Sequence, residues 1–399
     1  MSEILAANEG EHGDGTLLRG PFVSLAVAAL AFYIAGGVIL PITPTFVETR
    51  LGGGAFEVGI VFASYSIASL LLRPLVGWSS DRFGRRPLLI AGAVLTVAGM
   101  LLHLVAVNVA ILVAARSLLG AGEGFFLVAA LAAASDLAPP NRRGEALSFL
   151  SLSLYLGVAI GPLIGEAVLE RAGYDAVWLV TAAIAGLAVV LSLRTPETAP
   201  AVLAGGADRQ RPPLIHPAGL FPGLLALLGM WGMAGFFTFL PSHARAVGLA
   251  AASPALVVYA VTVVVLRIVG ARVPDRYGSS RVAMVALALS AVGLAIIGLV
   301  PTPAGLLAGT FVFATGIAFT APAIISMAVS RVPPEERGSV VGTTAVFLDL
   351  AFGVAPVVLG VMAVGTGAEA TFLLSAAVAA AGCAILVGRE VAVRRPVET

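Results

Sequence analysis

Charged residues, cysteine and lysine are all scarce in this sequence, and each scarcity excludes a class of protein. Only 11% of the 399 residues are charged and 59% are hydrophobic, with a mean hydropathy of +1.02. Soluble domains carry about 25% charged residues, so a water-soluble core could not enclose this much apolar surface. The single cysteine, Cys383, excludes an intrachain disulfide. Lysine is absent, and a net charge of +1 provides no field that favours nucleic acid as a partner.

The patterns that catalysis or ion conduction require are missing as well. An intramembrane enzyme needs a nucleophile–base pair or clustered metal ligands, but the four histidines are scattered and show no zinc-type or Ser–His spacing. A channel needs rings of like charge or a filter sequence, and neither occurs. We therefore expect no enzymatic activity, no metal and no cofactor.

Long apolar stretches fill the chain instead. A membrane-spanning helix needs roughly 20 apolar residues, and we count twelve such stretches, at about 22–46, 55–78, 87–107, 109–134, 145–169, 175–193, 217–240, 253–273, 281–300, 304–329, 339–364 and 370–388. The polar stretch near the middle has the proline, glycine and mixed charge of a linker. We predict an all-α membrane protein with a tail at 1–20, a six-helix half at 21–194, a linker at 195–216, a second six-helix half at 217–388 and a tail at 389–399.

A repeat with a constant offset supports this division. Arg73 and Asp81-Arg82-Phe83-Gly84 reappear 194 residues later as Arg267 and Asp275-Arg276-Tyr277-Gly278. The same offset relates Gly122 to Gly316 and Pro162 to Pro356. Two parallel copies of one unit are a common construction of secondary transporters.

The distribution of arginine predicts the orientation. Seventeen arginines fall on one side of the predicted spans, and only Arg50, Arg171 and Arg245 fall on the other. The positive-inside rule places the first side in the cytoplasm. Both termini are then cytoplasmic, which agrees with an even number of spans. We expect the protein in the inner (plasma) membrane.

The loop between spans 2 and 3 carries the most specific motif. It runs from Gly77 through Asp81, Arg82 and Gly84 to Arg85 and Arg86. Taken alone, it is a polar turn that obeys the positive-inside rule, but its echo at Asp275-Arg276 favours a larger role. The loop resembles the signature of the major facilitator superfamily, Gly-x-x-x-Asp-Arg-x-Gly-Arg-Arg. The second copy is degraded, with Ala271 and Ser279-Ser280 in place of the first glycine and the paired arginines.

This resemblance implies the major facilitator fold, with two pseudo-symmetric halves, and a gate on the cytoplasmic side. In such proteins the acid of the loop docks near the start of a helix in the other half, and its arginine pairs with an acid that ends span 4. Asp136 stands at that place here, so Asp81, Arg85 and Asp136 are the expected gate residues.

Span 5 carries a glycine motif. Gly157, Gly161, Pro162 and Gly165 follow the spacing of the superfamily's antiporter signature, Gly-x-x-x-Gly-Pro-x-x-Gly-Gly, with Glu166 in place of the last glycine. Glycines at this spacing also allow ordinary close packing of helices. The resemblance favours export over uptake.

Arg116, Glu123 and Asp349 lie well inside apolar spans, where a charge costs several kcal/mol and normally faces a cavity or a partner. Arg116 resembles the family's span-4 arginine, which has been linked to proton movement, and Glu123 lies two turns further along the same face. Asp349 is the single acid of span 11. A low-dielectric cavity favours the protonated form of a carboxyl group, so Glu123 and Asp349 are candidate proton carriers with Arg116 as their partner. The alternative is a permanent Arg116–Glu123 ion pair.

Arg73 and Arg267 lie two turns inside spans 2 and 8, where they either extend to the lipid surface or brace the gate. Aromatic residues are candidates for an apolar substrate cavity, although packing and lipid-facing positions account for most of them: Tyr33, Phe126, Tyr155, Trp231 and Phe236.

The sequence thus predicts a monomeric, proton-coupled antiporter that exports a small, partly apolar molecule, uncharged or cationic, by alternating access. Its expected partners are that substrate, protons and the lipid bilayer, without nucleic acid. An uptake symporter or uniporter remains open because span 1 has no acid at its centre and Glu166 departs from the motif. A non-transporting receptor on the same fold is a more remote alternative.

Overall fold

The computed structural model describes residues 20–139, 142–198, 215–270, 272–330, 332–333 and 336–394. Most of the predicted tails and of the linker lies outside these ranges. The last helix continues to Arg394, past the predicted boundary at residue 388, and the guanidinium carbon of Arg389 lies 3.8 Å above the ring of Phe221. The beginning of the predicted tail, 389–394, is therefore helical.

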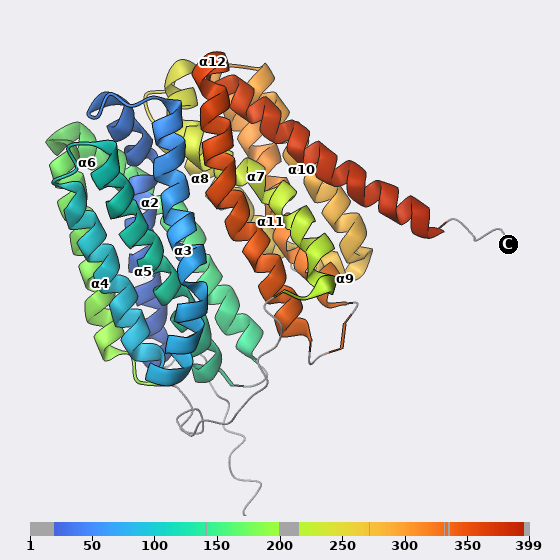
Figure 1. The fold of residues 1–399 in the computed structure, drawn as a ribbon, viewed down its shortest axis with the longest axis horizontal. Helices are drawn as coiled ribbons and strands as arrows, with labels where there is room; N and C mark the ends of the chain where they lie inside the picture. The colour runs from blue at the N-terminus through green and yellow to red at the C-terminus, as the bar shows by residue number, and fades with distance from the viewer. Residues whose placement is uncertain are drawn as a thin grey trace, which may run out of the picture.

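The described residues form helices joined by short turns (Figure 1). The helices are α2 (Gly20–Thr49), α3 (Ala55–Phe83), α4 (Arg85–His103), α5 (Val109–Leu137), α6 (Arg143–Arg194), α7 (Pro217–Ala246), α8 (Ser253–Val269), α9 (Val273–Tyr277), α10 (Ser279–Leu299), α11 (Pro303–Val329) and α12 (Arg337–Arg394).

Twelve spans can be traced through these helices. Within the described ranges, nine helices are long and apolar enough to cross a membrane, and α8 is a shorter apolar helix that α9 extends. α6 and α12 each contain two spans, because both bend at a glycine with positive φ: Gly173 (φ 77°, ψ −177°) and Gly367 (φ 79°, ψ 175°). Side chains other than hydrogen rarely permit such a backbone. The prediction of twelve spans is confirmed.

The repeat is visible in the backbone itself. Gly173 and Gly367 are 194 residues apart, as are the turn glycines Gly84 (φ 91°) and Gly278 (φ 86°). Each copy therefore turns at the same two places.

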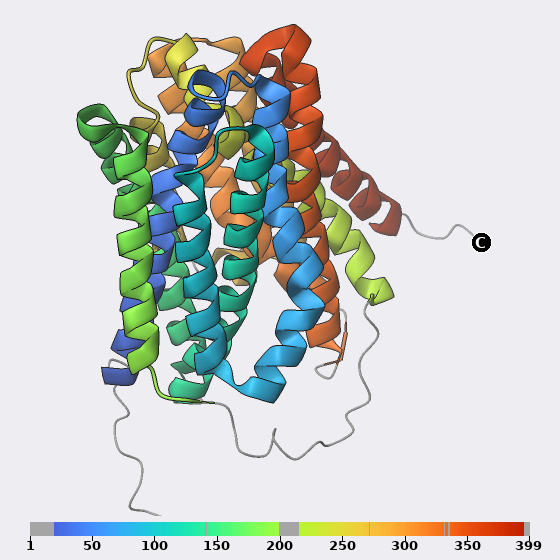
Figure 2. The ribbon, with the colours of Figure 1, turned by 60° about the vertical axis from the view of Figure 1, so that its left-hand side comes forward.

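The helices gather into two bundles, α2–α6 and α7–α12, which stand side by side in Figure 1 and partly overlap in the turned view of Figure 2. Within each bundle the first helix packs on the long kinked one, α2 on α6 and α7 on α12. Between bundles, α3 contacts α12, α8 contacts α6, and α2 contacts α7. We call the end of the bundles at which α3 ends and α4 begins the linker end, and the end at which α2 ends and α3 begins the far end.

Candidate functional site

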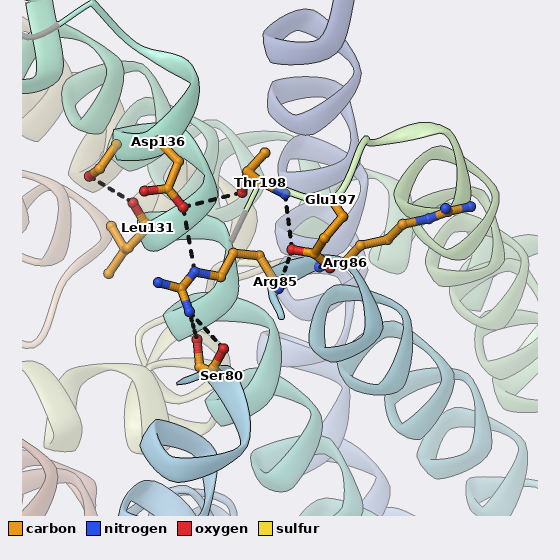
Figure 3. A network of polar contacts seen from close by, with 8 residues as sticks. Ser80, Arg85, Arg86, Leu131, Asp136, Glu197 and Thr198 are labelled. Carbon is orange, nitrogen blue, oxygen red and sulfur yellow. Dashed lines mark hydrogen bonds and ion pairs between the residues drawn. The ribbon is translucent and has the colours of Figure 1, made fainter. Parts of the chain in front are cut away.

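A buried arginine organises the linker end of the first half (Figure 3). α3 ends at Phe83, Gly84 makes the turn, and Arg85 begins α4. The Arg85 Nη1 donates to the carbonyl oxygen of Ser80 at 2.6 Å and to its Oγ at 3.0 Å. Its Nε lies 3.4 Å from Oδ2 of Asp136 at the end of α5. The structure thus brings together the two residues that the family resemblance pairs, and their role in gating remains a prediction.

Glu197, which the sequence did not single out, completes this network. Its carboxylate accepts hydrogen bonds from the backbone N–H groups of Arg85 (2.8 Å) and Arg86 (3.2 Å) at the start of α4. The neighbouring Thr198 donates to Oδ2 of Asp136 at 3.2 Å. The chain that leaves α6 is therefore attached to the same loop (Figure 3). The position of Glu197 just after span 6 was the available sequence signal for this contact, but a lone acid in a polar stretch is not specific.

Other predicted gate residues are placed only in part. Of Gly77, Asp81 and Asp275 only the backbone is described. Arg82 is exposed and its guanidinium carbon lies 5.7 Å from the centre of the Phe83 ring, while Arg276 lies 5.5 Å from that of Tyr277. The Arg86 Nη2 donates to the carbonyl oxygen of Leu193 at 2.7 Å.

Two arginines related by the repeat cross from one half to the other. Arg73 on α3 forms an ion pair with Asp349 on α12, in which Nη2 donates to Oδ1 at 2.7 Å. Arg267 on α8 places its guanidinium carbon 4.8 Å from the centre of the Tyr155 ring on α6. Arg267 is the repeat counterpart of Arg73, and Tyr155 that of Asp349. The same contact therefore occurs twice, once with an acid and once with a neutral ring.

The other two charged candidates, Arg116 and Glu123, have different partners. The Oγ of Ser69 on α3 donates to Oε2 of Glu123 at 3.0 Å. Arg116 is 4% exposed, and its guanidinium carbon lies 4.9 Å from the centre of the Phe62 ring and 5.1 Å from that of Tyr65. Arg116 and Glu123, both described, form no ion pair in the structure. The permanent pair considered from the sequence is therefore not formed.

The glycine motif of span 5 brings α6 against α2. A Cβ at Gly161 would lie 2.5 Å from the carbonyl carbon of Gly37, and Gly157 and Gly165 approach the α2 backbone as closely. Pro162 lies in the same turns. These glycines therefore serve packing within the first half, and a link to antiport remains a prediction.

Glu166, the departure from that motif, reaches the other half. Its two carboxylate oxygens accept from the backbone N–H groups of Ala252 (2.7 Å) and Ser253 (3.2 Å), at the beginning of α8. A carboxylate at this place is favoured by the partial positive charge of a helix N-terminus. Glu166 thus joins α6 to α8 at the far end.

A second contact at the far end joins α2 to α7. Glu48 accepts from Ser242 Oγ at 2.5 Å and forms an ion pair with Arg245, whose Nη1 also donates to Thr45 at 2.8 Å. Ser242 is the repeat counterpart of Glu48. The two halves are therefore bound together at the far end.

Toward the linker end, helices of both halves line a partly open cavity of about 620 Å³. Ligand cavities commonly measure about 300–1,000 Å³. Its walls come from α6, α8, the start of α9 and α11, and include Leu152, Tyr155, Val264, Arg267 and Phe319.

Of the five aromatic candidates for a substrate cavity, Tyr155 lines this one. Phe126 is fully buried and stacks on Phe32 with ring centres 4.1 Å apart, and Phe236 is fully buried beside Tyr259. Tyr33 is buried, and Trp231 is half-buried. Phe126 and Phe236 therefore serve the packing of their halves.

Comparison with known proteins identifies the family. The model of the Major Facilitator Superfamily matches residues 25–273 and 223–398. The chain belongs to the Major Facilitator Superfamily. It is 30% identical over 377 residues to an uncharacterized MFS-type transporter of Salmonella typhimurium, covering 91% of this chain and 94% of the relative. It is 28% identical over 372 residues to one of Burkholderia mallei, covering 91% and 90%.

Solved structures show the same fold. A POT family transporter in complex with 5-aminolevulinic acid aligns with a TM-score of 0.79 at 13% identity, covering 94% of this chain and 96% of that one. The human organic anion transporter MFSD10 aligns with a TM-score of 0.70 at 18% identity, covering 92% and 98%. Because the family and the curated relatives are transporters, this major facilitator is a multi-pass membrane transporter of small molecules and not an enzyme.

Proposed function

We propose that this transporter exports a small, partly apolar molecule by alternating access of its two halves and that proton uptake drives the cycle. The observation that carries the proposal is the Arg73–Asp349 ion pair between α3 and α12. This contact joins the halves through an acid that can be neutralised. A proton on Asp349 removes the negative charge that holds Arg73, so proton binding and separation of the two helices favour each other.

Glu123 is the second member of this proposed coupling site. It accepts a hydrogen bond from Ser69, which lies one helical turn from Arg73 on α3. A proton entering the region can therefore be shared between two carboxyl groups, one in each half. Arg116 lies apart from them against aromatic rings, so we assign it to holding α5 on α3 through cation–π contacts.

The arrangement of contacts supports a state that is closed at the far end, in which the Arg73–Asp349 ion pair is also formed. The halves are joined at the far end by Glu166 and Glu48, while the cavity lies toward the linker end. The excess of arginine at the linker end favours its placement in the cytoplasm, with both termini on that side of the plasma membrane. Cargo then enters the cavity from the cytoplasm, as export requires.

The glycine motif of α6 is the argument for export and for antiport. Uptake by symport, or uniport, uses the same two conformations and remains the alternative. Antiport and symport differ in the direction in which a proton gradient moves the substrate.

The test begins with a growth and accumulation screen of a deletion strain against toxic compounds and metabolites, which supplies a transported compound. Substrate-induced proton release is then measured on the purified protein for the parent, Glu123→Gln and Asp349→Asn. We expect release from the parent and a loss of release in the variants. Glu170→Gln, an exposed carboxyl at the far end, is the matched control. Release of protons from both coupling variants at the parental level would contradict the assignment.

A further inference from the structure

We propose that the cavity between α6, α8 and α11 binds a small organic monoanion, a carboxylate or a similar acid with an apolar body, and that Arg267 is its charged contact. This inference rests on the proposed transport function and names the class of substrate. It also replaces the expectation of an uncharged or cationic cargo.

The first observation is an uncompensated charge. The repeat places one arginine in each of two contacts between the halves, Arg73 where α3 meets α12 and Arg267 where α8 meets α6. Arg73 is neutralised by Asp349. At the equivalent place in the other interface, the residue that faces Arg267 is Tyr155, which provides a ring and no negative charge. Within the described residues, no acid forms an ion pair with Arg267.

A guanidinium inside a membrane protein is costly and is normally paired or turned toward water. Arg267 is half-buried and lines the cavity. The one described acid of the lining, Glu145, is already engaged by Arg142, whose Nε and Nη2 donate to it at 2.7 and 2.8 Å. The counter-charge that the repeat supplies to Arg73 is thus left for a ligand to supply to Arg267.

The walls define the rest of the ligand. Leu152, Val264, Ile268 and Phe319 are apolar, and the Tyr155 ring already covers one face of the guanidinium. An anionic group can approach the planar guanidinium edge in the two-point manner that favours carboxylates and related oxyanions. A volume of about 620 Å³ accommodates a small molecule with one aromatic or aliphatic body.

Binding to the purified full-length protein in detergent tests this, with three probes of nearly equal size: 4-phenylbutyrate, 4-phenylbutyramide and 4-phenylbutylamine. We expect calorimetric binding of the anion, binding of the amide weaker by about tenfold or more, and the weakest binding for the amine, because a hydrogen bond to a charged group contributes more than a neutral one.

Three variants separate the charge from the ring. Arg267→Gln is expected to remove the preference for the anion. Tyr155→Asp copies the acid at position 349 and supplies an internal counter-charge, so it should also remove the preference. Tyr155→Phe keeps the ring and should keep the preference. Arg171→Gln, which removes an exposed arginine at the far end, is the control and should bind as the parent does.

Equal binding of anion and amide, an unchanged preference in Arg267→Gln, or no binding of the anion at millimolar concentration would each overturn the inference. If Arg267→Gln does not yield folded protein, Tyr155→Asp decides the question. Flux in reconstituted vesicles distinguishes the two proposals. An anion that binds through Arg267 but is not moved by a proton gradient contradicts the transport proposal alone, whereas proton-driven flux of another compound without anion binding contradicts this inference alone.

Discussion

Replacing Glu166 should loosen the far end of the transporter. The carboxylate accepts from two backbone N–H groups at the start of α8, in the opposite half. In Glu166→Gln the side chain keeps its size, but one oxygen becomes an NH₂ group that cannot accept. At least one charge-assisted hydrogen bond is lost, and such a bond contributes about 1.5–3 kcal/mol.

Because Glu166 is half-buried, we take the lower end of that range, about 1.5 kcal/mol, which corresponds to about a tenfold change in an equilibrium constant. The ratio of far-end-open to far-end-closed molecules should therefore rise about tenfold. Glu166→Gly, which restores the glycine of the family motif, should raise it further, because it removes both hydrogen bonds.

Pulsed electron paramagnetic resonance can measure this shift. Spin labels at the exposed positions Ala172 and Ala250, one on each half at the far end, are introduced into a Cys383→Ala background. The long-distance component should grow in Glu166→Gln and stay unchanged in Glu170→Gln. Distance distributions that are identical in Glu166→Gln and the parent would refute the reasoning that Glu166 holds the halves together.

Two further predictions concern the gate loop and the packing of α6. Asp81→Asn should cripple transport without removing the protein from the membrane, as measured by flux at matched expression, and an unchanged rate would reduce Asp81 to a solvated turn residue. Gly161→Ala should lower stability by about 1–3 kcal/mol, because the new Cβ would lie 2.5 Å from the backbone of Gly37. Thermal unfolding checks this against Gly186→Ala, whose Cβ meets no atom within 4 Å, and equal melting temperatures would contradict it.

The sequence was sufficient for the features that hydrophobicity and repetition determine. The twelve spans follow from apolar length, and the turns at Gly84 and Gly278 follow from the repeated loop. The approach of Arg85 to Asp136 followed from the family resemblance, because the motif and the end of span 4 occupy fixed places in the fold.

Contacts between distant helices were not predictable in the same way. Arg73 and Asp349 were each singled out, but nothing in the sequence states that α3 and α12 meet at their level. Arg116 and Glu123 share a helix face, yet their side chains diverge because aromatic rings on α3 receive the guanidinium and Ser69 receives the carboxylate. Glu166 was visible as a departure from a motif, while its partners lie 86 and 87 residues further along the chain.

Proton binding at Asp349 should release its ion pair with Arg73 and let the two halves separate at the linker end. The most direct measurement is the distance between spin labels at Phe83 and Gly338, both exposed at that end, recorded against pH in the Cys383→Ala background. Acidification of the parent should raise the fraction of molecules at the longer distance. Asp349→Asn should show the longer distance at every pH. A parent distribution that does not change with pH, or an Asp349→Asn variant that responds to pH as the parent does, would contradict this role of Asp349.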